Sequence, residues 1–241
     1  MKILHLIVAR GGSKGIPGKN LHEIGGISLV GFKAIAAKRS QYCSRLIIST
    51  DSMVIQENAK TYGVEVPFIR PIELATDRAK TEDVIVHAIE YIENNEGQTY
   101  DAIMLLEPSS PFLRATDIDK AVKMMIEKKA NLIVGVREVN VASVFMGPLD
   151  QEGRITSIID KMASLEGLSR QDVQQEFTMN GALYLIKWDY FKKHRHRYKD
   201  RLNSYGLIMP WEYSVEIDEP ADLAYAEYLV EKGLIDLSYW R

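Results

Sequence analysis

The sequence has little cysteine, little excess charge and no long apolar run. Cys43 is the only cysteine among 241 residues, which excludes an internal disulfide and any metal cluster built on several cysteines. The 30 Lys and Arg against 33 Asp and Glu leave a net charge of −3, so nothing attracts the whole chain to nucleic acid or anionic membranes. The apolar runs fall short of the roughly 20 residues of a membrane span, and no signal-peptide layout precedes the first run. We therefore expect a cytoplasmic protein without nucleic-acid or membrane partners.

The composition is that of an ordinary globular protein. It is 46% hydrophobic and 26% charged, and its length suits one large α/β domain or two small ones. Because the sequence contains no internal repeat and no linker, we predict a single domain over residues 1–241.

Short apolar runs alternate with amphipathic segments. The runs are typical of strands buried on both faces of a parallel sheet, and they cover residues 3–9, 46–49, 102–106, 132–136 and 183–186. Helices are predicted over 81–94, from a capping box of Thr116 and Asp119 to about 129, and from Pro220 to Gly233. This alternation predicts an α/β fold with a three-layer, doubly wound, mostly parallel sheet that binds ligands at the carboxyl ends of its strands.

The alternation weakens between residues 137 and 177. This segment contains Gly147, Pro148 and Gly153, and then a polar run. We interpret it as an insertion for dimerisation or substrate contact, while a long pair of ordered loops is an equally open alternative.

A basic, glycine-rich loop directly follows the first apolar run. Four glycines within residues 9–20 let the backbone wrap an anion and offer its N–H groups. Arg10, Lys14 and Lys19 add positive charge of about the size that a triphosphate needs. The loop has neither the spacing of a Walker A motif nor a G-x-G-x-x-G, and a basic turn exposed to solvent is the alternative.

Further blocks follow this loop in a fixed order along the chain. They are Arg10-x-x-Ser13-Lys14-x-x-x-x-Lys19-Asn20, Arg70-Pro71-x-Glu73-Leu74-Ala75-x-Asp77, the stretch LLEPSSPFLR from Leu105 to Arg114, Ser169-Arg170-Gln171-Asp172 before Asn180-Gly181-Ala182-Leu183-Tyr184, and Ser214-Val215-Glu216-Ile217-Asp218-x-x-x-Asp222-Leu223. Together they resemble the cytidylyltransferases that activate nonulosonic acids, namely the acylneuraminate (CMP-sialic acid) synthetases and their legionaminate and pseudaminate relatives. The resemblance implies a nucleotide-diphospho-sugar transferase-like fold, CTP and a nonulosonic acid as substrates, Mg²⁺ as cofactor, and a homodimer.

The resemblance also implies roles for residues near the nucleotide. The implied nucleotide-binding residues are Arg10, Ser13, Lys14, Lys19, Asn20 and Arg70. Arg10 and Lys14 would hold the triphosphate, and Lys19 would stabilise charge that develops on the α-phosphate, so Lys19, Arg10 and Asp218 are the expected catalytic residues. Arg70 would lie at the cytosine end, and a surface salt bridge to Glu73 is its alternative.

Glu216 and Asp218 are the candidate magnesium ligands. Residues i and i+2 of a strand share a face, so both carboxylates can reach one Mg²⁺. The resembling enzymes usually have Asp at the first position, where this chain has Glu216. Charges that favour the N-terminus of the helix at Pro220 are the alternative.

The resemblance implies that Glu107, Arg170 and Asn180 contact the sugar. An arginine fork suits a sugar carboxylate, which is the role implied for Arg170. Glu107 stands where those enzymes commonly have Gln, and Thr178-Met179 replaces an Arg-Pro pair. Both differences argue against N-acetylneuraminate as the substrate, and a structural acid paired with Arg114 is the alternative for Glu107.

The sequence leaves alternative functions, although the blocks at Arg170-Gln171-Asp172 and Asn180-Gly181 argue against other sugar substrates, and the intact set of Arg10, Lys14, Lys19 and Asp218 argues against a silent relative. A cytidylyltransferase for another acid sugar such as Kdo, one of the methylerythritol-phosphate type, and a catalytically silent nucleotide-binding relative are the alternatives. The basic run from Lys192 to Arg201 is predicted to be a solvated face rather than a nucleic-acid site.

Overall fold

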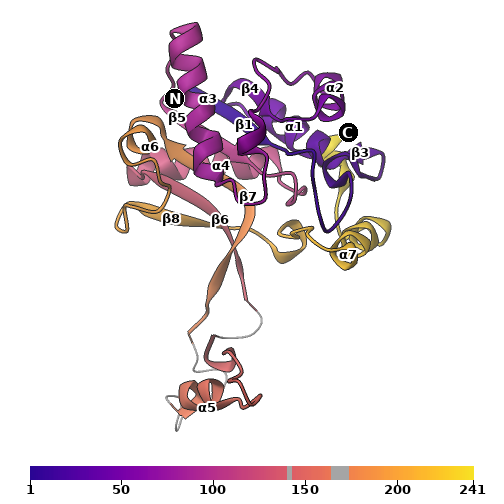
Figure 1. Ribbon diagram of the computed structural model, residues 1–241, viewed down its shortest axis with the longest axis vertical. Coiled ribbons are helices and arrows are strands. Elements are labelled where there is room, and N and C mark those ends of the chain that lie inside the picture. Colours follow the sequence, from indigo (N-terminus) through magenta and orange to yellow (C-terminus); the bar gives the residue numbers. More distant parts are fainter. Residues whose placement is uncertain (140–142, 164–173) are drawn as a thin grey trace.

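The computed structural model describes residues 1–139, 143–163 and 174–241. Within these ranges a six-stranded sheet with the order β4-β1-β5-β7-β6-β8 forms the centre (Figure 1). Its strands are β1 (Ile3–Val8), β4 (Cys43–Ser49), β5 (Ala102–Leu106), β6 (Leu132–Glu138), β7 (Phe177–Lys187) and β8 (Ser204–Ile208). β7 pairs antiparallel with both of its neighbours, whereas the other pairs are parallel. The predicted mostly parallel α/β sheet is confirmed.

Helices cover both faces of this sheet. One face packs against α1 (Leu29–Arg39), α2 (Met53–Thr61), α4 (Ala115–Lys128) and α7 (Pro220–Glu231), and the other packs against α3 (Thr81–Glu96) and α6 (Trp188–His194). The side chains of β5 alternate between the two cores and are all buried, which explains the unbroken apolar run. A small hairpin of β2 (Glu23–Ile24) and β3 (Ile27–Ser28) precedes α1. No helix among the described residues is long and apolar enough to cross a membrane.

The predicted start of α4 is wrong. The N-cap is Arg114, and its capping box uses Asp117, so Thr116 lies inside the helix. Asp119 does not cap the helix; its carboxylate accepts a hydrogen bond of 2.6 Å from the hydroxyl of Ser40, which follows α1. The sequence suggested Thr116 because Thr is a common N-cap and Arg is not.

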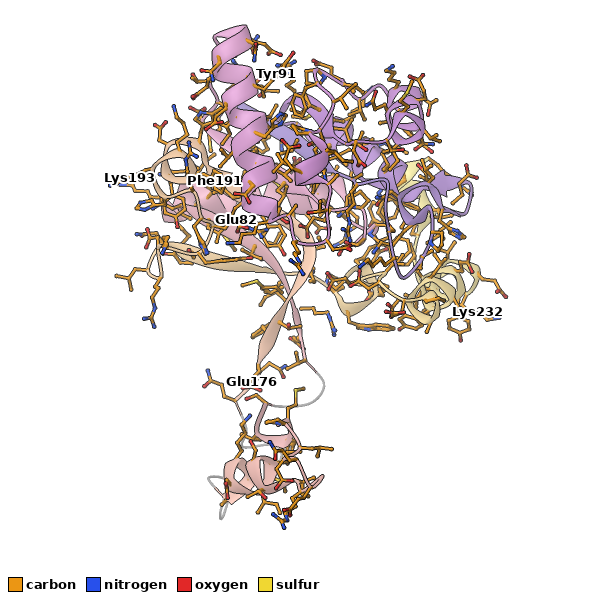
Figure 2. The ribbon with its side chains drawn as sticks, in the orientation of Figure 1. Glu82, Tyr91, Glu176, Phe191, Lys193 and Lys232 are labelled. Carbon is orange, nitrogen blue, oxygen red and sulfur yellow. The ribbon has the colours of Figure 1, made fainter. Side chains whose placement is uncertain are left out.

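The predicted insertion leaves the body of the molecule as an arm. β6 and β7 continue beyond the sheet as a two-stranded antiparallel ribbon that pairs Arg137 with Thr178 and Glu138 with Phe177. The ribbon leads to η3 (Ser143–Phe145) and α5 (Thr156–Ala163), far from the helices of the body (Figures 1 and 2). The described part of the segment thus contains an ordered ribbon and a helix, and its role as an insertion for dimerisation stays a prediction.

Candidate active site

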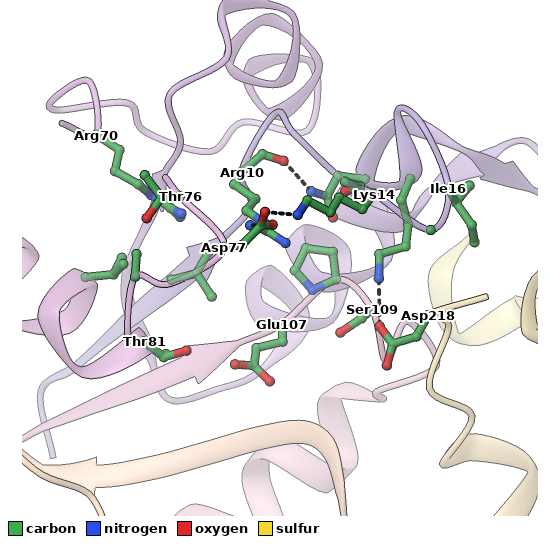
Figure 3. A pocket seen from close by; sticks show the side chains of 18 of the residues that line it. Arg10, Lys14, Ile16, Arg70, Thr76, Asp77, Thr81, Glu107, Ser109 and Asp218 are labelled. Atoms are coloured by element: carbon green, nitrogen blue, oxygen red, sulfur yellow. Dashed lines mark hydrogen bonds and ion pairs between the residues drawn. The ribbon is translucent and has the colours of Figure 1, made fainter. Parts of the chain in front are cut away.

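A cavity of about 410 Å³ opens at the carboxyl ends of β1 and β5 (Figure 3). Its walls are the glycine loop, the segment from Arg70 to Val84, the residues after β5, and Asp218. The predicted site residues that line it are Arg10, Ser13, Lys14, Lys19, Asn20, Arg70, Glu107 and Asp218. Residues nearly 200 positions apart in the chain thus meet where a doubly wound sheet binds its ligands.

Two glycines and an asparagine give the basic loop its shape. A Cβ on Gly15 would lie 2.3 Å from the backbone oxygen of Asp218, so only glycine allows this close approach. Gly18 has a φ of +69°, which lets the chain turn into η1 (Lys19–Leu21). The buried Asn20 amide donates to the Arg10 carbonyl at 2.9 Å and ties the two ends of the loop together. The loop is therefore held open around the cavity.

Lys19 lies between the loop and the acidic segment near the C-terminus. Its ammonium donates to the Ile217 carbonyl at 2.6 Å and to Asp218 Oδ1 at 2.9 Å. Its side chain is mostly buried, whereas that of Asp218 is exposed. These contacts fix a positive charge at the cavity wall while one side of the Asp218 carboxylate faces solvent.

Arg10 and Lys14 share one carboxylate, which the sequence had not singled out. Arg10 Nη1 lies 2.6 Å from Asp77 Oδ1, and Lys14 Nζ lies 2.5 Å from Asp77 Oδ2. The two cations hold the pKa of the Asp77 carboxyl below its usual range, Lys14 most strongly. Asp77 is part of the block that begins at Arg70, so its place in a motif was the only signal available.

Arg70 is buried, and it does not form the surface salt bridge with Glu73 that was the alternative prediction. Its side chain is 5% exposed, and its guanidinium donates to the hydroxyl and the carbonyl of Ser49 at the end of β4. Burial lowers the pKa of Arg70 to about 10. It therefore presents a cation to the cavity from a fixed position beside the sheet.

The predicted magnesium ligands share one face of an extended segment. Glu216 and Asp218 are exposed, whereas Ile217 between them is fully buried and its N–H donates to the Ser109 carbonyl at 2.7 Å. Partial desolvation of the Glu216 carboxyl group raises its pKa, and the charge of Asp218 raises it further. The cap of α7 is formed by Glu219 with Asp222, so this pair is not required to start the helix.

Glu107 faces the cavity from the end of β5, below the glycine loop (Figure 3). Burial raises the pKa of its carboxyl, and the charges of Arg197 and Lys33 oppose this rise. Arg114, the partner offered for a structural Glu107, instead makes a two-pronged pair with Asp117 at 2.8 and 2.9 Å. Glu107 is therefore not a structural acid paired with Arg114, and it remains available to a ligand in the cavity.

Asn180 lies in the core behind the cavity and is 1% exposed. Its amide donates to the Ser214 hydroxyl at 2.9 Å, and its Oδ1 accepts the N–H of Ala182 at 3.1 Å. The Ser110 hydroxyl donates to its backbone carbonyl at 2.9 Å. This arrangement ties β7 to the segment that carries the acidic pair, and Asn180 is not among the cavity-lining residues. Arg170 lies outside the described residues.

Comparison with known proteins identifies the family. The sequence profile described as cytidylyltransferase matches residues 4–233. The chain belongs to the cytidylyltransferase family. It is therefore a nucleotidyltransferase, as the ordered blocks predicted.

Named relatives extend over nearly the whole cytidylyltransferase chain. It is 30% identical to CMP-N,N'-diacetyllegionaminic acid synthase of Legionella pneumophila over 233 residues, which are 96% of this chain and 97% of that one. It is 32% identical to N-acylneuraminate cytidylyltransferase of Escherichia coli over 96% of this chain and 52% of that protein. A CMP:2-keto-3-deoxy-manno-octonic acid synthetase solved with CTP has a TM-score of 0.67 at 14% identity, covering 97% of this chain and all of that one. That structure supports the fold alone.

Two further charged residues of this cytidylyltransferase were missed by the sequence analysis. Arg197, within the run predicted to be a solvated face, has a side chain only 11% exposed. Its Nε donates to Glu82 at 3.0 Å, its guanidinium lies 4.6 Å from the ring centre of Tyr184, and its buried Nη1 has no partner among the described residues. Lys33 is fully buried in α1 and donates to the Ala182 carbonyl at 2.7 Å. No local pattern marks either residue, because neighbours from distant elements bury them.

Proposed function

We propose that this cytidylyltransferase joins CMP from CTP to a nonulosonic acid. In this reaction a hydroxyl oxygen of the sugar acid attacks the α-phosphorus of CTP and its proton is released to water, while the bond from that phosphorus to the bridging oxygen breaks and pyrophosphate leaves. The observation that carries the proposal is the meeting of Arg10, Lys14 and Lys19 with Glu107 and Asp218 around one cavity. A site of this kind works by positioning the substrates and neutralising charge.

Lys19 is the proposed stabiliser of the reacting phosphate. Its ammonium is fixed by Ile217 and Asp218, so it needs little reorganisation as negative charge develops. Arg10 and Lys14 come earlier in the same loop and would hold the leaving pyrophosphate part of the triphosphate. Arg70 would bind at the nucleoside end from its buried position beside β4.

The acidic pair fits a magnesium ion, which we propose as the cofactor. Two like charges share one face of an extended segment. The pKa of Glu216 is raised first by partial desolvation and then by Asp218, and a bound cation would offset the repulsion between the two carboxylates. Mg²⁺ prefers one or two carboxylates together with phosphate oxygens. The described residues contain no group of three or more potential ligands, so this site depends on the nucleotide to complete it. The bound ion would supply further neutralisation of the triphosphate charge.

The sugar is proposed to lie against Glu107, at the end of the cavity away from Arg10. The similarity to a diacetyllegionaminate enzyme over nearly full length favours a nonulosonic acid over Kdo, whose synthetase is similar here in fold alone. Because an ionised Glu only accepts hydrogen bonds, the substrate would present a hydroxyl or N–H to it. The contact of Arg170 with the sugar carboxylate remains part of the proposal.

Pyrophosphate release from CTP with single sugar acids tests this function. The panel contains N-acetylneuraminate, N,N'-diacetyllegionaminate, pseudaminate and Kdo, each with and without Mg²⁺. We expect release with at least one nonulosonic acid, dependence on Mg²⁺, and little release with Kdo. Release with Kdo alone would support the other acid-sugar activity, and binding of CTP without release for any sugar would support a silent relative.

We also propose a homodimer formed through the arm. Apolar side chains on the described part of the arm are about half exposed, namely Met146, Leu149, Ile155, Ile159 and Met162. A second copy of the arm would remove them from water, which is a common origin of exposed apolar patches. Light scattering at micromolar concentration is expected to give twice the mass of the chain, and Ile159→Glu is expected to give the monomer. A parent protein that is fully active as a monomer contradicts this proposal.

A further inference from the structure

Asp77 holds the first two cations of the glycine loop, Arg10 and Lys14, at the same time. Each of its carboxylate oxygens faces a different partner, with Oδ1 at 2.6 Å from Arg10 and Oδ2 at 2.5 Å from Lys14. Figure 3 shows the carboxylate next to Arg10 and directed at Lys14. It therefore sits where a phosphate group bound by Arg10 and Lys14 would have to go.

The segment that carries Asp77 is anchored at both ends. At its start the Arg70 N–H donates to the Thr50 carbonyl at 2.9 Å, and the buried guanidinium is bonded to Ser49. At its end the chain enters α3 at Thr81. Asp77 lies on the exposed turn between these anchors, so its carboxylate can leave the loop without disturbing the core.

We propose that Asp77 occupies the phosphate-binding cations when no nucleotide is present, yields them to the triphosphate of CTP, and returns to them as pyrophosphate leaves. The inference rests on the proposed function, because it takes Arg10 and Lys14 to be triphosphate ligands. It adds a positioning residue that acts through those two cations.

The exposure of the three side chains suits an exchange of this kind. Lys14 is 80% exposed, Asp77 42% and Arg10 34%, so their ion pairs are screened by water and cost little to open. A triphosphate carries several negative charges whereas Asp77 carries one, so the triphosphate displaces Asp77 from the two cations. Asp77 then stands beside bound phosphate as a like charge, which weakens binding. This repulsion acts on CTP and, more importantly for turnover, on the product pyrophosphate.

Asp77→Asn separates this role from a structural one. The substitution keeps the shape and removes the charge, so we expect calorimetry to give a Kd about threefold to tenfold lower for CTP and for pyrophosphate. We expect KM for CTP to fall without any rise in kcat, and pyrophosphate to become a stronger inhibitor. The difference from the parent should shrink as salt is added, because exposed charges are screened. If Asp77 merely held the loop in shape, both ligands would bind more weakly.

Glu73→Gln is the matched control. Glu73 is an exposed acid on the same segment, outside the residues that line the cavity, and its loss changes the net charge by the same amount. We expect its affinities to stay within about twofold of the parent. Asp77→Ala should act in the same direction as Asp77→Asn, which guards against a defect particular to one variant.

The outcomes separate this inference from the proposed function. A parent enzyme that binds neither CTP nor pyrophosphate would overturn the proposed function. A parent that binds both, with unchanged or weaker binding in Asp77→Asn, overturns the role of Asp77 alone. If Glu73→Gln increased the affinity for CTP and pyrophosphate as much as Asp77→Asn does, the effect would be one of net charge, and the role of Asp77 would also be overturned.

Discussion

One wall of the cavity, the glycine loop, carries exposed ion pairs such as that of Lys14 with Asp77. The layer behind the cavity around Asn180 and Lys33, called here the buried wall, is bonded to both backbone and side-chain groups. Lys14 is 80% exposed, but Asn180 and Lys33 are 1% and 0% exposed. An exposed ion pair exchanges partners readily, and a buried polar group is costly to leave unsatisfied. The first wall is therefore suited to binding and releasing a charged nucleotide, and the second to holding a fixed shape.

The largest expected effect is on the glycine-loop wall, from Lys19→Ala. Loss of one preorganised donor to developing charge typically lowers kcat by about 10²–10³. The affinity for CTP should change much less, because Arg10 and Lys14 still hold the triphosphate. Steady-state kinetics and calorimetry measure the two quantities, and Lys60→Ala on the exposed face of α2 is the control. A kcat within a few-fold of the parent would remove Lys19 from its proposed role.

The next effect concerns His5, a buried polar residue in the middle of β1. It is fully buried, and neither ring nitrogen has a partner among the described residues. Burial lowers the pKa of His5 to about 4, from 6.5 in the unfolded chain. Above pH 6.5 the ring is neutral in both states and its contribution to stability is constant. As pH falls toward 4 only the unfolded chain takes up the proton, so the free energy of unfolding drops by about 3 kcal/mol.

Urea unfolding at pH 7 and pH 4.5 measures this effect. His5→Leu should lose less stability between the two values than the parent does, because carboxylates titrate alike in both proteins. Identical losses in the two proteins would mean that His5 is protonated, or already partnered, in the folded state.

Asn180→Ala and Ser13→Ala compare the two walls directly. Removing the Asn180 amide leaves the buried N–H of Ala182 unsatisfied, which is expected to cost about 1–3 kcal/mol of unfolding free energy. Ser13 lies on the accessible loop, so its truncation should change stability by less than about 0.5 kcal/mol. Chemical unfolding gives both values, and equal losses would contradict the contrast between the walls.

The same contrast explains which features could be predicted from the sequence. Five of the six strands of the central sheet were visible because each contains a continuous buried run, and the glycine loop was visible because its charges and glycines are contiguous. β8 was missed, because only Leu207 within it is buried. The N-cap Arg114 was missed because an arginine cap depends on its pairing with Asp117. Lys33 and Arg197 were missed because long-range packing alone buries them. The exposed wall could be predicted because its residues are contiguous in the sequence. The buried wall could not, because its residues come together only when distant elements pack.

The smallest expected effect concerns the choice of sugar. It depends on Glu107, which lines the cavity and also lies near the buried wall. Glu107 lines the cavity, yet it lies near the buried charges of Arg197 and Lys33, which oppose the burial-driven rise in its pKa. As a carboxylate it accepts hydrogen bonds only, so a substrate carbonyl at this place finds no donor, whereas a hydroxyl or N–H is accepted. Glu107→Gln supplies a donor, and an unmet polar group of this kind costs about 1–3 kcal/mol.

We therefore expect Glu107→Gln to raise kcat/KM for N-acetylneuraminate, relative to the best natural substrate, by at least about fivefold. Competition assays with both sugars measure this ratio directly, and Glu127→Gln on the exposed side of α4 controls for net charge. The ratio should respond to Glu107 alone, because CTP binding depends on the other wall. If Glu107→Gln changes the rate with both sugars equally, Glu107 affects the transfer reaction itself and does not discriminate between sugars.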